Sequence, residues 1–485
     1  MQKLTREQIL ANYNAGPEAV VRLIEQLFEF VEANEIISKQ LQSRVKELEA
    51  QLAKNSSNSH KPPASDGFKK QTKSLRRKSK RKAGGQKVRK GQTLKQVATP
   101  DRIIKCSVTT CTGCGESLQS KKTEHIEKRQ VFDIPPITMQ VTEYQAETKV
   151  CSHCQTTTKG RFPGTVTQTV QYGPGIKSQA VYLMNQHLLP YKRTSELLAD
   201  FYGHAISQGT LYNFNKECSR ALEKPVKNIK DQIVDSPVVH FDESGLKIDK
   251  TTKWLHSAGT KQWTYYTAHQ KRGSDAMNDA DILPRFKGIA VHDFWKPYFK
   301  YSCAHALCNA HHLRELIFLF EHEKQKWAQK MIVLFLHIKH SVEKARASGV
   351  KKLARSKIAQ FEKRYQQIIA QGCAVNPDTD PARHRKKKSK AQNLLFRFQN
   401  NRDRVLAFMY DFQVPFDNNL AERDIRMIKV HQKISGCFRS DTGAEMFCRI
   451  RSYISTVNKQ DYHVLSALKS AFDGIDIFQV ANAAE

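Results

Sequence analysis

The first sixty residues repeat an apolar position every seven residues, with a second apolar position in between, as the seam of a coiled coil does. Two polar residues in the middle of this seam, Asn34 and Ser38, would weaken the pairing while fixing its register. The alternative is an amphipathic helix packed on the chain's own core, but the narrow stripe favours self-association. We therefore expect a short coiled coil over residues 1–60. Its seam consists of Leu27, Asn34, Leu41 and Leu48 at d, and of Ile24, Val31, Ser38, Val45 and Leu52 at a.

A helical periodicity returns in residues 166–235, where two apolar-striped segments flank a short polar turn. The turn is Tyr202-Gly203-His204, and Ser207 is a suitable N-cap for the second helix. This is the outline of a helix-turn-helix, whose second helix enters the major groove of DNA. A plain helical hairpin has the same outline, so the pattern leaves both open. The residues available to touch bases are Gln208, Thr210, Tyr212 and Asn213.

From residue 236 onward, short β-rich runs with polar breaks replace the helical pattern. Two of these runs, VVHFDES and IAVHDFW, end in a carboxylate just past an apolar strand, at Asp242 and Asp293. A third acid, Glu422, lies in a helical segment with one face of leucine and isoleucine. Side chains at strand ends are held by the sheet yet open to solvent, as a metal-binding acid has to be.

Two strand-end aspartates and one helical glutamate are the smallest set that holds two Mg²⁺ ions about 3.5–4 Å apart. Such ions activate a water or a 3′-hydroxyl and stabilise the leaving oxygen of a phosphodiester. Spacing alone supports this weakly, because the chain has 47 acidic residues and a strand-end Asp is commonly a turn residue or a cap.

The composition narrows the class of protein. The 485 residues include 79 Lys and Arg against 47 Asp and Glu, a formal net charge of +32, and 39% are hydrophobic. Such a chain is expected to form several domains and to bind a polyanion, of which nucleic acid is the commonest. No run reaches the roughly 18 apolar residues of a membrane span, and the N-terminus lacks a secretory signal. We therefore expect a cytoplasmic protein without membrane contact.

The positive charge is concentrated in two runs. Residues 61–95 carry fourteen Lys and Arg against one acid, and residues 381–404 carry nine against one. A solubilising tail is the plainer interpretation of the first run. Cations this dense also neutralise phosphates and release counterions, which favours contact with the DNA backbone. The candidates at its centre are Arg76, Arg77, Lys78, Lys80, Arg81 and Lys82.

Two C-x2-C pairs indicate a zinc site. They are Cys111 with Cys114 and Cys151 with Cys154, and 36 residues separate the pairs. In a chain without an export signal, cysteines are metal ligands or buried thiols before they are disulfides. Four thiolates supply one tetrahedral structural Zn²⁺, without which so small a ribbon has too little core to fold. The alternative is four unrelated thiols, and Cys106 is a fifth cysteine nearby.

Most of the chain is spanned by a series of distinctive strings: NSSNSHKPPASDG, GGQKVRKGQTL, HFDESGLKI, WLHSAGT, VHDFWKPY, HALCNAHHLREL, VPFDNNLAERDIRM and QKISGCFRSDTGAEMFCRIRSYIST. Together they resemble the transposase of the insertion sequence 66 family. The resemblance implies an α/β, RNase H-like catalytic core of the DDE type, in which Asp242, Asp293 and Glu422 are the catalytic, Mg²⁺-binding acids. Mn²⁺ is expected to substitute for Mg²⁺. The zinc ribbon at the four paired cysteines is implied as well.

These patterns and the resemblance together divide the chain into six parts. We expect a coiled coil at 1–60, a basic DNA-binding linker at 61–100, a zinc ribbon at 101–165 and a helix-turn-helix-like region at 166–235. The catalytic domain follows at 236–438, with a helical insertion at about 320–410, and a small C-terminal domain occupies 439–485.

Other candidates lie close to the predicted acids. Glu243 follows Asp242 and His292 precedes Asp293, but a strand places such neighbours on the opposite face, so we rank them second. Five residues of CAHALCNAHH have ligand-like spacing, although the start of a buried helix is a plainer interpretation than a second zinc site. They are Cys303, His305, Cys308, His311 and His312.

Arg423 and Arg426 lie one and four residues from Glu422. They are positioned either to bind the scissile phosphate or to form a solvated helix face, and the adjacent acid favours DNA. Trp254 and Trp263 are expected in the core of the sheet, and nothing selects one of them to stack on a flipped base.

The sequence is thus interpreted as a DNA transposase. It is expected to bind the terminal inverted repeats of its element as double-stranded DNA, to cleave the ends by Mg²⁺-dependent hydrolysis and to join the 3′-hydroxyl ends to target DNA. The partners expected are a second copy in a dimer and small accessory proteins of the same element, at the nucleoid of a bacterial cytoplasm. The alternatives are a non-catalytic DNA-binding regulator and a metal-dependent nuclease without strand transfer.

Overall fold

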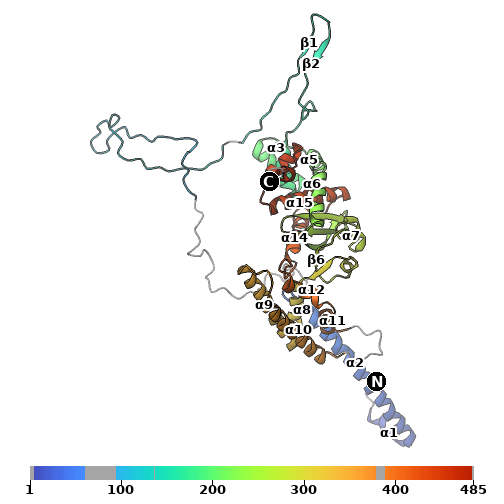
Figure 1. Ribbon diagram of the computed structural model, residues 1–485. Helices are drawn as coiled ribbons and strands as arrows, with labels where there is room; N and C mark the ends of the chain where they lie inside the picture. The colour runs from blue at the N-terminus through green and yellow to red at the C-terminus, as the bar shows by residue number, and fades with distance from the viewer. Residues whose placement is uncertain (1–4, 60–93, 136, 378–387, 483–485) are drawn as a thin grey trace. The chain divides into compact units, whose positions relative to one another are not determined.

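The computed structural model describes residues 5–59, 94–135, 137–377 and 388–482 (Figure 1). Contacts divide the chain into two compact units. The first comprises residues 1–73, 172–194 and 208–485, and the second comprises residues 74–171 and 195–207. Within the described residues, no helix combines the length and the apolar character needed to cross a membrane.

The first unit contains a five-stranded mixed sheet in the order β5-β4-β3-β6-β7. β3, β6 and β7 run parallel, whereas β3, β4 and β5 form an antiparallel meander. The chain is therefore a mixed α/β protein, as predicted. The strands and their connecting helical turns are β3 (Val238–Ile248), β4 (Thr251–Gly259), β5 (Thr264–His269), α7 (Ser274–Ala280), β6 (Ile289–His292), η2 (Lys296–Lys300) and β7 (Ala304–Leu307).

Two helices, α14 (Asn419–Ile434) and α15 (Asp441–Lys459), pack on the meander (Figure 1). The Tyr266 amide of β5 donates to Ser452 Oγ of α15 at 2.8 Å. The helices and strands share one apolar cluster, so α15 continues the core of the sheet, and residues 439–482 belong to the same compact unit. The separate small C-terminal domain that we expected is therefore absent from residues 439–482. Members of the shared cluster include Leu246, Ile248, Leu255, Ile425, Ile428 and Phe447.

This unit also contains helices that precede the strands in the chain and helices that follow α15. Asn185 Nδ2 of α3 donates to Asn215 Oδ1 of α5 at 2.8 Å, and both side chains are buried. Arg449 Nη1 of α15 donates to the Ser219 carbonyl of α5 at 3.2 Å. One face of α5 therefore packs against α3 and α15. These helices are α3 (Pro174–Asn185), α5 (Gln208–Ala221), α6 (Glu223–Val234), α16 (Val464–Phe472) and α17 (Ile477–Asn482).

A helical segment lies between β7 and α14 in the chain, and its apolar residues share one cluster with Val291, Ala306 and Leu307 of the sheet. Phe335, Tyr365 and Phe398 pack in its interior, where the Tyr365 hydroxyl donates to the Phe398 carbonyl at 3.0 Å. A helical segment that packs on the β6–β7 side of the sheet thus lies between Asp293 and Glu422 in the chain. The helices are α8 (Asn309–Glu321), α9 (Lys326–Ala347), α10 (Arg355–Val375), α11 (Lys390–Asn400), α12 (Arg402–Val405) and α13 (Ala407–Tyr410).

At the N-terminus, α1 (Arg6–Asn14) begins with a capping box between Thr5 and Gln8, and α2 (Pro17–Leu52) begins with proline at N1. No residue of α2, which the structure describes throughout, is buried. The predicted seam is consequently exposed in the single chain, with Leu41 at 61% exposure. The coiled coil itself stays a prediction.

The second unit contains a short antiparallel hairpin of β1 (Thr148–Val150) and β2 (Thr157–Lys159). An isolated bridge between Thr110 and Ser117 makes a second, similar turn. In the helix-turn-helix-like region, α4 (Tyr191–Tyr202) ends at Gly203, whose φ of 65° is the left-handed conformation that favours glycine.

Candidate functional site

Asp242 on β3 and Asp293 just after β6 both lie beyond the point where these neighbouring parallel strands stop pairing. The pairing of β3 with β6 ends with His240 opposite Val291, and each aspartate follows two residues later. Asp293 follows the end of β6, as predicted. Asp242 is not at a strand end, because β3 continues to Ile248 through its pairing with β4.

The surroundings of Asp242 oppose its ionisation. The pKa of this carboxyl is raised to about 8, first by burial and then by the negative charges of Glu243, Glu422 and Asp293. The Glu243 amide, which donates to Asp242 Oδ1 at 2.9 Å, acts in the opposite direction. Buried carboxylates that repel one another are the electrostatic setting that a bound divalent cation relieves.

Asn418 connects the strand of Asp242 to the helix of Glu422. It is buried directly before α14, and its side chain reaches β3 twice. Asn418 Oδ1 lies 2.7 Å from His240 Nδ1, and its Nδ2 donates to the Phe241 carbonyl at 2.8 Å. Sequence reasoning missed this residue. The string FDNN before the helix was its only signal, because the partners lie far away in the chain.

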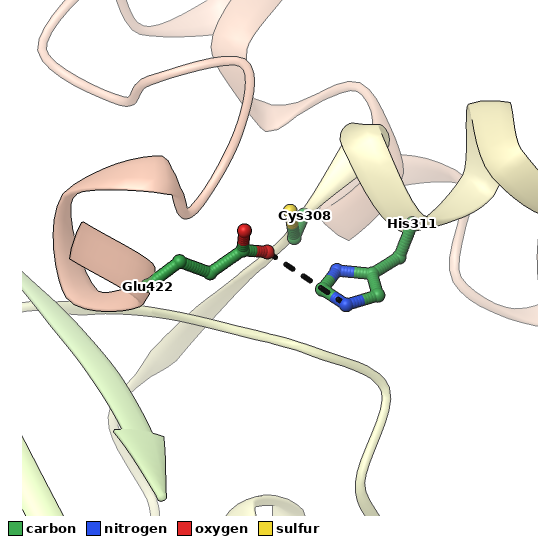
Figure 2. A group of neighbouring side chains, drawn as sticks. All are labelled: Cys308, His311 and Glu422. Atoms are coloured by element: carbon green, nitrogen blue, oxygen red, sulfur yellow. Dashed lines mark ion pairs between the residues drawn. The ribbon is translucent and has the colours of Figure 1, made fainter. Parts of the chain in front are cut away.

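Glu422 lies in the first turn of α14, and its carboxylate contacts residues of α8. Arg314 Nη2 donates to Glu422 Oε1 at 3.3 Å, and His311 Nε2 lies 3.8 Å from the same oxygen. Figure 2 shows the carboxylate and the imidazole facing each other, with the thiol of Cys308 beside them. The start of α8 therefore supplies three of the groups around this acid.

The three predicted catalytic acids do not converge on one point. In the described parts of the chain, the only group of three or more potential ligands whose atoms all lie within 4.8 Å is Cys308, His311 and Glu422. Glu422 and Asp293 nevertheless raise the pKa of Asp242 through their charges, so the three carboxylates share one electrostatic environment. The carboxylate oxygens suit Mg²⁺ in kind, and Glu422 would have to turn toward the aspartates to join them.

Glu243 belongs to a separate buried network. Its carboxylate accepts from Arg272 Nη2 at 2.7 Å and from the Tyr298 hydroxyl at 2.6 Å. The Arg272 guanidinium lies over the rings of Trp254 and Trp295, 4.9 Å and 4.2 Å from their centroids. Trp254 thus packs against the arginine that pairs with Glu243, and Arg272 and Tyr298 are residues that sequence reasoning did not select.

His292 also lies apart from the acids. It is fully buried, stacks on Tyr298 with 4.4 Å between ring centroids, and places Nε2 3.1 Å from His305 Nδ1. Burial lowers the pKa of His292 to about 3, so the ring is neutral at pH 7. Of the five candidate ligands between Cys303 and His312, which we ranked below a plain buried helix start, only Cys308 and His311 lie in a group with an acid.

The basic candidates differ in what the structure shows of them. Arg423 and Arg426 are exposed on α14. On α5, Gln208 and Asn213 are exposed, whereas Thr210 and Tyr212 are half-buried. The other predicted DNA-binding residues lie outside the described residues: Arg76, Arg77, Lys78, Lys80, Arg81 and Lys82.

The paired cysteines lie in two turns of the same form. In each turn the amide of the first cysteine donates to the carbonyl five residues later, at 2.9 Å for Cys111 and 3.0 Å for Cys151. The amide four residues after that cysteine donates back to it, and this position, Gly115 or Gln155, has a positive φ in both turns. Each of these matching turns contains a C-x2-C pair, which is the ligand spacing of structural zinc sites.

Hydrogen bonds in these turns favour thiolates, the form that binds zinc. The pKa of Cys111 is lowered chiefly by the backbone amide of Cys114, and that of Cys154 chiefly by the Thr156 hydroxyl. The structure does not gather the thiols into a group within 4.8 Å in the residues it describes. The donor set is the one that Zn²⁺ prefers.

Comparison with protein families gives three matches along the chain. The transposase IS66 family matches residues 169–446, which include Asp242, Asp293 and Glu422. The zinc-finger binding domain of transposase IS66 matches residues 109–155, which include all four paired cysteines. A family of unknown function matches residues 13–95. No curated protein matches the chain.

Proposed function

The chain belongs to the transposase IS66 family, since the match covers more than half of its residues, and we propose that it cuts the ends of an insertion sequence and joins them to target DNA. Its zinc-finger match agrees with a transposase that binds both zinc and DNA.

Asp242, Asp293 and Glu422 are proposed to hold the two catalytic Mg²⁺ ions, which Mn²⁺ would replace. The observation that carries this proposal is that Asp242 and Asp293 each follow two residues after the last pair of β3 with β6. The charges of Asp293 and Glu422 also raise the pKa of half-buried Asp242. Bound magnesium would polarise the phosphodiester and lower the pKa of the attacking hydroxyl or water. Asp242 and Asp293 would bind from just beyond the parallel strand pairing, which holds the backbone before each of them side by side.

Glu422 completes this set from α14. In the structure its carboxylate accepts from Arg314, so this contact has to open before the side chain faces Asp242. The hydrogen bonds of Asn418 to β3 hold the first turn of α14 beside the strand of Asp242, which limits the change to side-chain rotation. Asn418 is therefore proposed as a positioning residue.

We propose an RNase H-like catalytic core at 236–438 with a helical insertion at about 320–410. The mixed sheet of the first unit, with Asp242 and Asp293 beside its parallel strand pair, is compatible with that fold. The run of helices between β7 and α14, which packs against β6 and β7, supports the insertion.

DNA binding is proposed to use several surfaces. Arg423 and Arg426, exposed on the helix of Glu422, would bind phosphates close to the cut. The exposed residues of α5, the zinc ribbon and the basic run at 61–95 would bind the terminal repeats. The exposed seam of α2 supports pairing of two chains through a coiled coil, so that two ends are held together.

A strand-transfer assay tests the proposal. The protein is incubated with labelled oligonucleotides that carry the ends of its element, with target plasmid and Mg²⁺. Nicked ends and joined products are expected from the wild type and neither from Asp293→Ala. Binding without nicking would favour a DNA-binding regulator, and nicking without joining would favour a nuclease.

A further inference from the structure

Cys308, His311 and Glu422 form a group of potential metal ligands separate from the paired cysteines (Figure 2). Cys308 follows β7 and directly precedes α8, His311 lies in the first turn of α8, and Glu422 lies in the first turn of α14. The sulfur, one ring nitrogen and one carboxylate oxygen all lie within 4.8 Å of one another. Two helix starts thus bring three different donor types to one point.

Hydrogen bonds that involve the backbone hold these helix starts in place without any ion. The Asn418 amide donates to Cys308 Sγ at 3.1 Å, and the Asn309 amide donates to the Phe416 carbonyl at 3.1 Å. Asn309 Nδ2 donates to the Val405 carbonyl at 2.9 Å. Because these bonds fix the backbone of both segments, the three donors are preorganised to within side-chain rotations.

The donor atoms of this group favour a different ion from the one that the carboxylates of Asp242 and Asp293 favour. Thiolate and imidazole favour Zn²⁺ and related ions, whereas carboxylates and water favour Mg²⁺. Ligands bound tetrahedrally to Zn²⁺ at about 2.0–2.3 Å lie about 3.3–3.8 Å apart. The group closes to that spacing if its most distant atoms approach by about 1 Å, which rotation of the Glu422 side chain supplies.

We propose that Cys308, His311 and Glu422 bind a thiophilic divalent ion such as Zn²⁺, and that this ion keeps Glu422 on the α8 side, away from Asp242 and Asp293. On binding, the Cys308 thiol gives up its proton to solvent and the contact of Glu422 with Arg314 opens. The second half of the proposal rests on the proposed function of Glu422. Zn²⁺ at this site and Mg²⁺ at the aspartates then compete for one carboxylate, so Zn²⁺ inhibits cleavage.

Cobalt absorption tests the site itself. Full-length protein with its ribbon zinc in place is titrated with Co²⁺, whose bond to a thiolate absorbs in the near ultraviolet. We expect a band in the wild type that Cys308→Ser lacks. Cys303→Ser is the matched control, because Cys303 is also buried but lies outside the group, and it should keep the band. Equal bands in both variants, or none in the wild type, would overturn the site.

Inhibition by Zn²⁺ tests the link to Glu422. In Mg²⁺, cleavage by the wild type and Cys303→Ser should fall as Zn²⁺ is added, and cleavage by Cys308→Ser should persist. Equal inhibition of the two variants contradicts the competition. If no variant cleaves in Mg²⁺ alone, the proposed function fails, whereas the cobalt band still decides whether the site exists.

Discussion

His240 of β3 and Asn418 of the segment before α14 are joined by a 2.7 Å contact between Nδ1 and Oδ1. Both residues are buried, and His240 lies two residues before Asp242 on the same strand. Asn418 also donates to the Phe241 carbonyl and, through its amide, to Cys308 Sγ. Through its side chain and its backbone amide, Asn418 therefore links the strand of Asp242, the helix of Glu422 and the start of α8.

Replacing Asn418 should cost both stability and activity. In Asn418→Ala the Phe241 carbonyl and the His240 ring lose their partner inside the protein, and we expect unfolding to become easier by about 2–3 kcal/mol. DNA cleavage should fall more than the folded fraction does, because Glu422 loses its alignment with Asp242. Denaturant unfolding and cleavage rates per folded molecule measure the two effects.

The neighbouring Asn419→Ala is the control, since Asn419 is exposed at the start of the same helix. If both variants lose activity only in proportion to unfolding, Asn418 has no positioning role.

The stability of the metal-free protein should depend on pH through Asp242. An ordinary aspartate has a pKa of 3.8, and that of Asp242 is raised to about 8, so the fold favours the protonated form. Stability from this group is present below about pH 4 and is lost as pH rises toward 8. Asp242→Asn imitates the protonated carboxyl. It should match the wild type near pH 4 and exceed it at pH 8.5 by an amount on the order of a few kcal/mol.

Thermal unfolding of both proteins at the two pH values, without divalent ions, gives the comparison. Mg²⁺ should reduce the difference in stability between Asp242→Asn and the wild type at pH 8.5, because a cation stabilises the ionised carboxylate and not the amide. A gap that is the same at both pH values would show that Asp242 is not buried among like charges.

Arg272 should contribute to stability beyond an ordinary surface cation. The Glu243 side chain is only 2% exposed, so Arg272→Ala leaves a buried carboxylate with the Tyr298 hydroxyl alone. We expect a loss of about 3 kcal/mol. Lys271→Ala removes an exposed ion pair with Asp275 from the same loop and should cost less than about 1 kcal/mol. Similar losses in the two variants would contradict the network.

The paired cysteines should bind one Zn²⁺ per chain. Cys151→Ser removes one of four proposed ligands and should lower the zinc content by one equivalent, because three thiolates hold zinc far less tightly. Cys106→Ser, which removes an exposed cysteine outside the two turns, should keep the zinc. Metal analysis and proteolysis of residues 101–165 measure the outcome. An unchanged zinc content in Cys151→Ser would contradict the proposal that the four paired cysteines bind zinc.

Local patterns in the sequence predicted the parts of the site that depend on neighbouring residues. The position of Asp293 after an apolar strand and the helical placement of Glu422 both follow from short windows of residues, and the structure agrees with them. The two cysteine turns are local as well, since each closes within six residues. Such features are determined by the periodicity and turn chemistry of the segment itself.

The remaining parts depend on contacts between distant segments. The strand of Asp242 continues because β4 folds back on it, which the apolar run alone did not indicate. Arg314 and Glu422 are 108 residues apart in sequence, and the helical segment between β7 and α14 brings them together. The boundary expected at residue 439 was wrong for a similar reason, since α15 packs on strands that precede it by nearly two hundred residues.

The most direct test of the catalytic assignment is the initial rate of Mg²⁺-dependent cleavage of labelled element-end DNA by three full-length proteins. The wild type and Asp235→Ala, which changes an exposed aspartate at the end of α6, should cleave at similar rates. Asp293→Ala should bind the same DNA with unchanged affinity and cleave it at least about 1000-fold more slowly. Cleavage by Asp293→Ala at the wild-type rate would contradict the account.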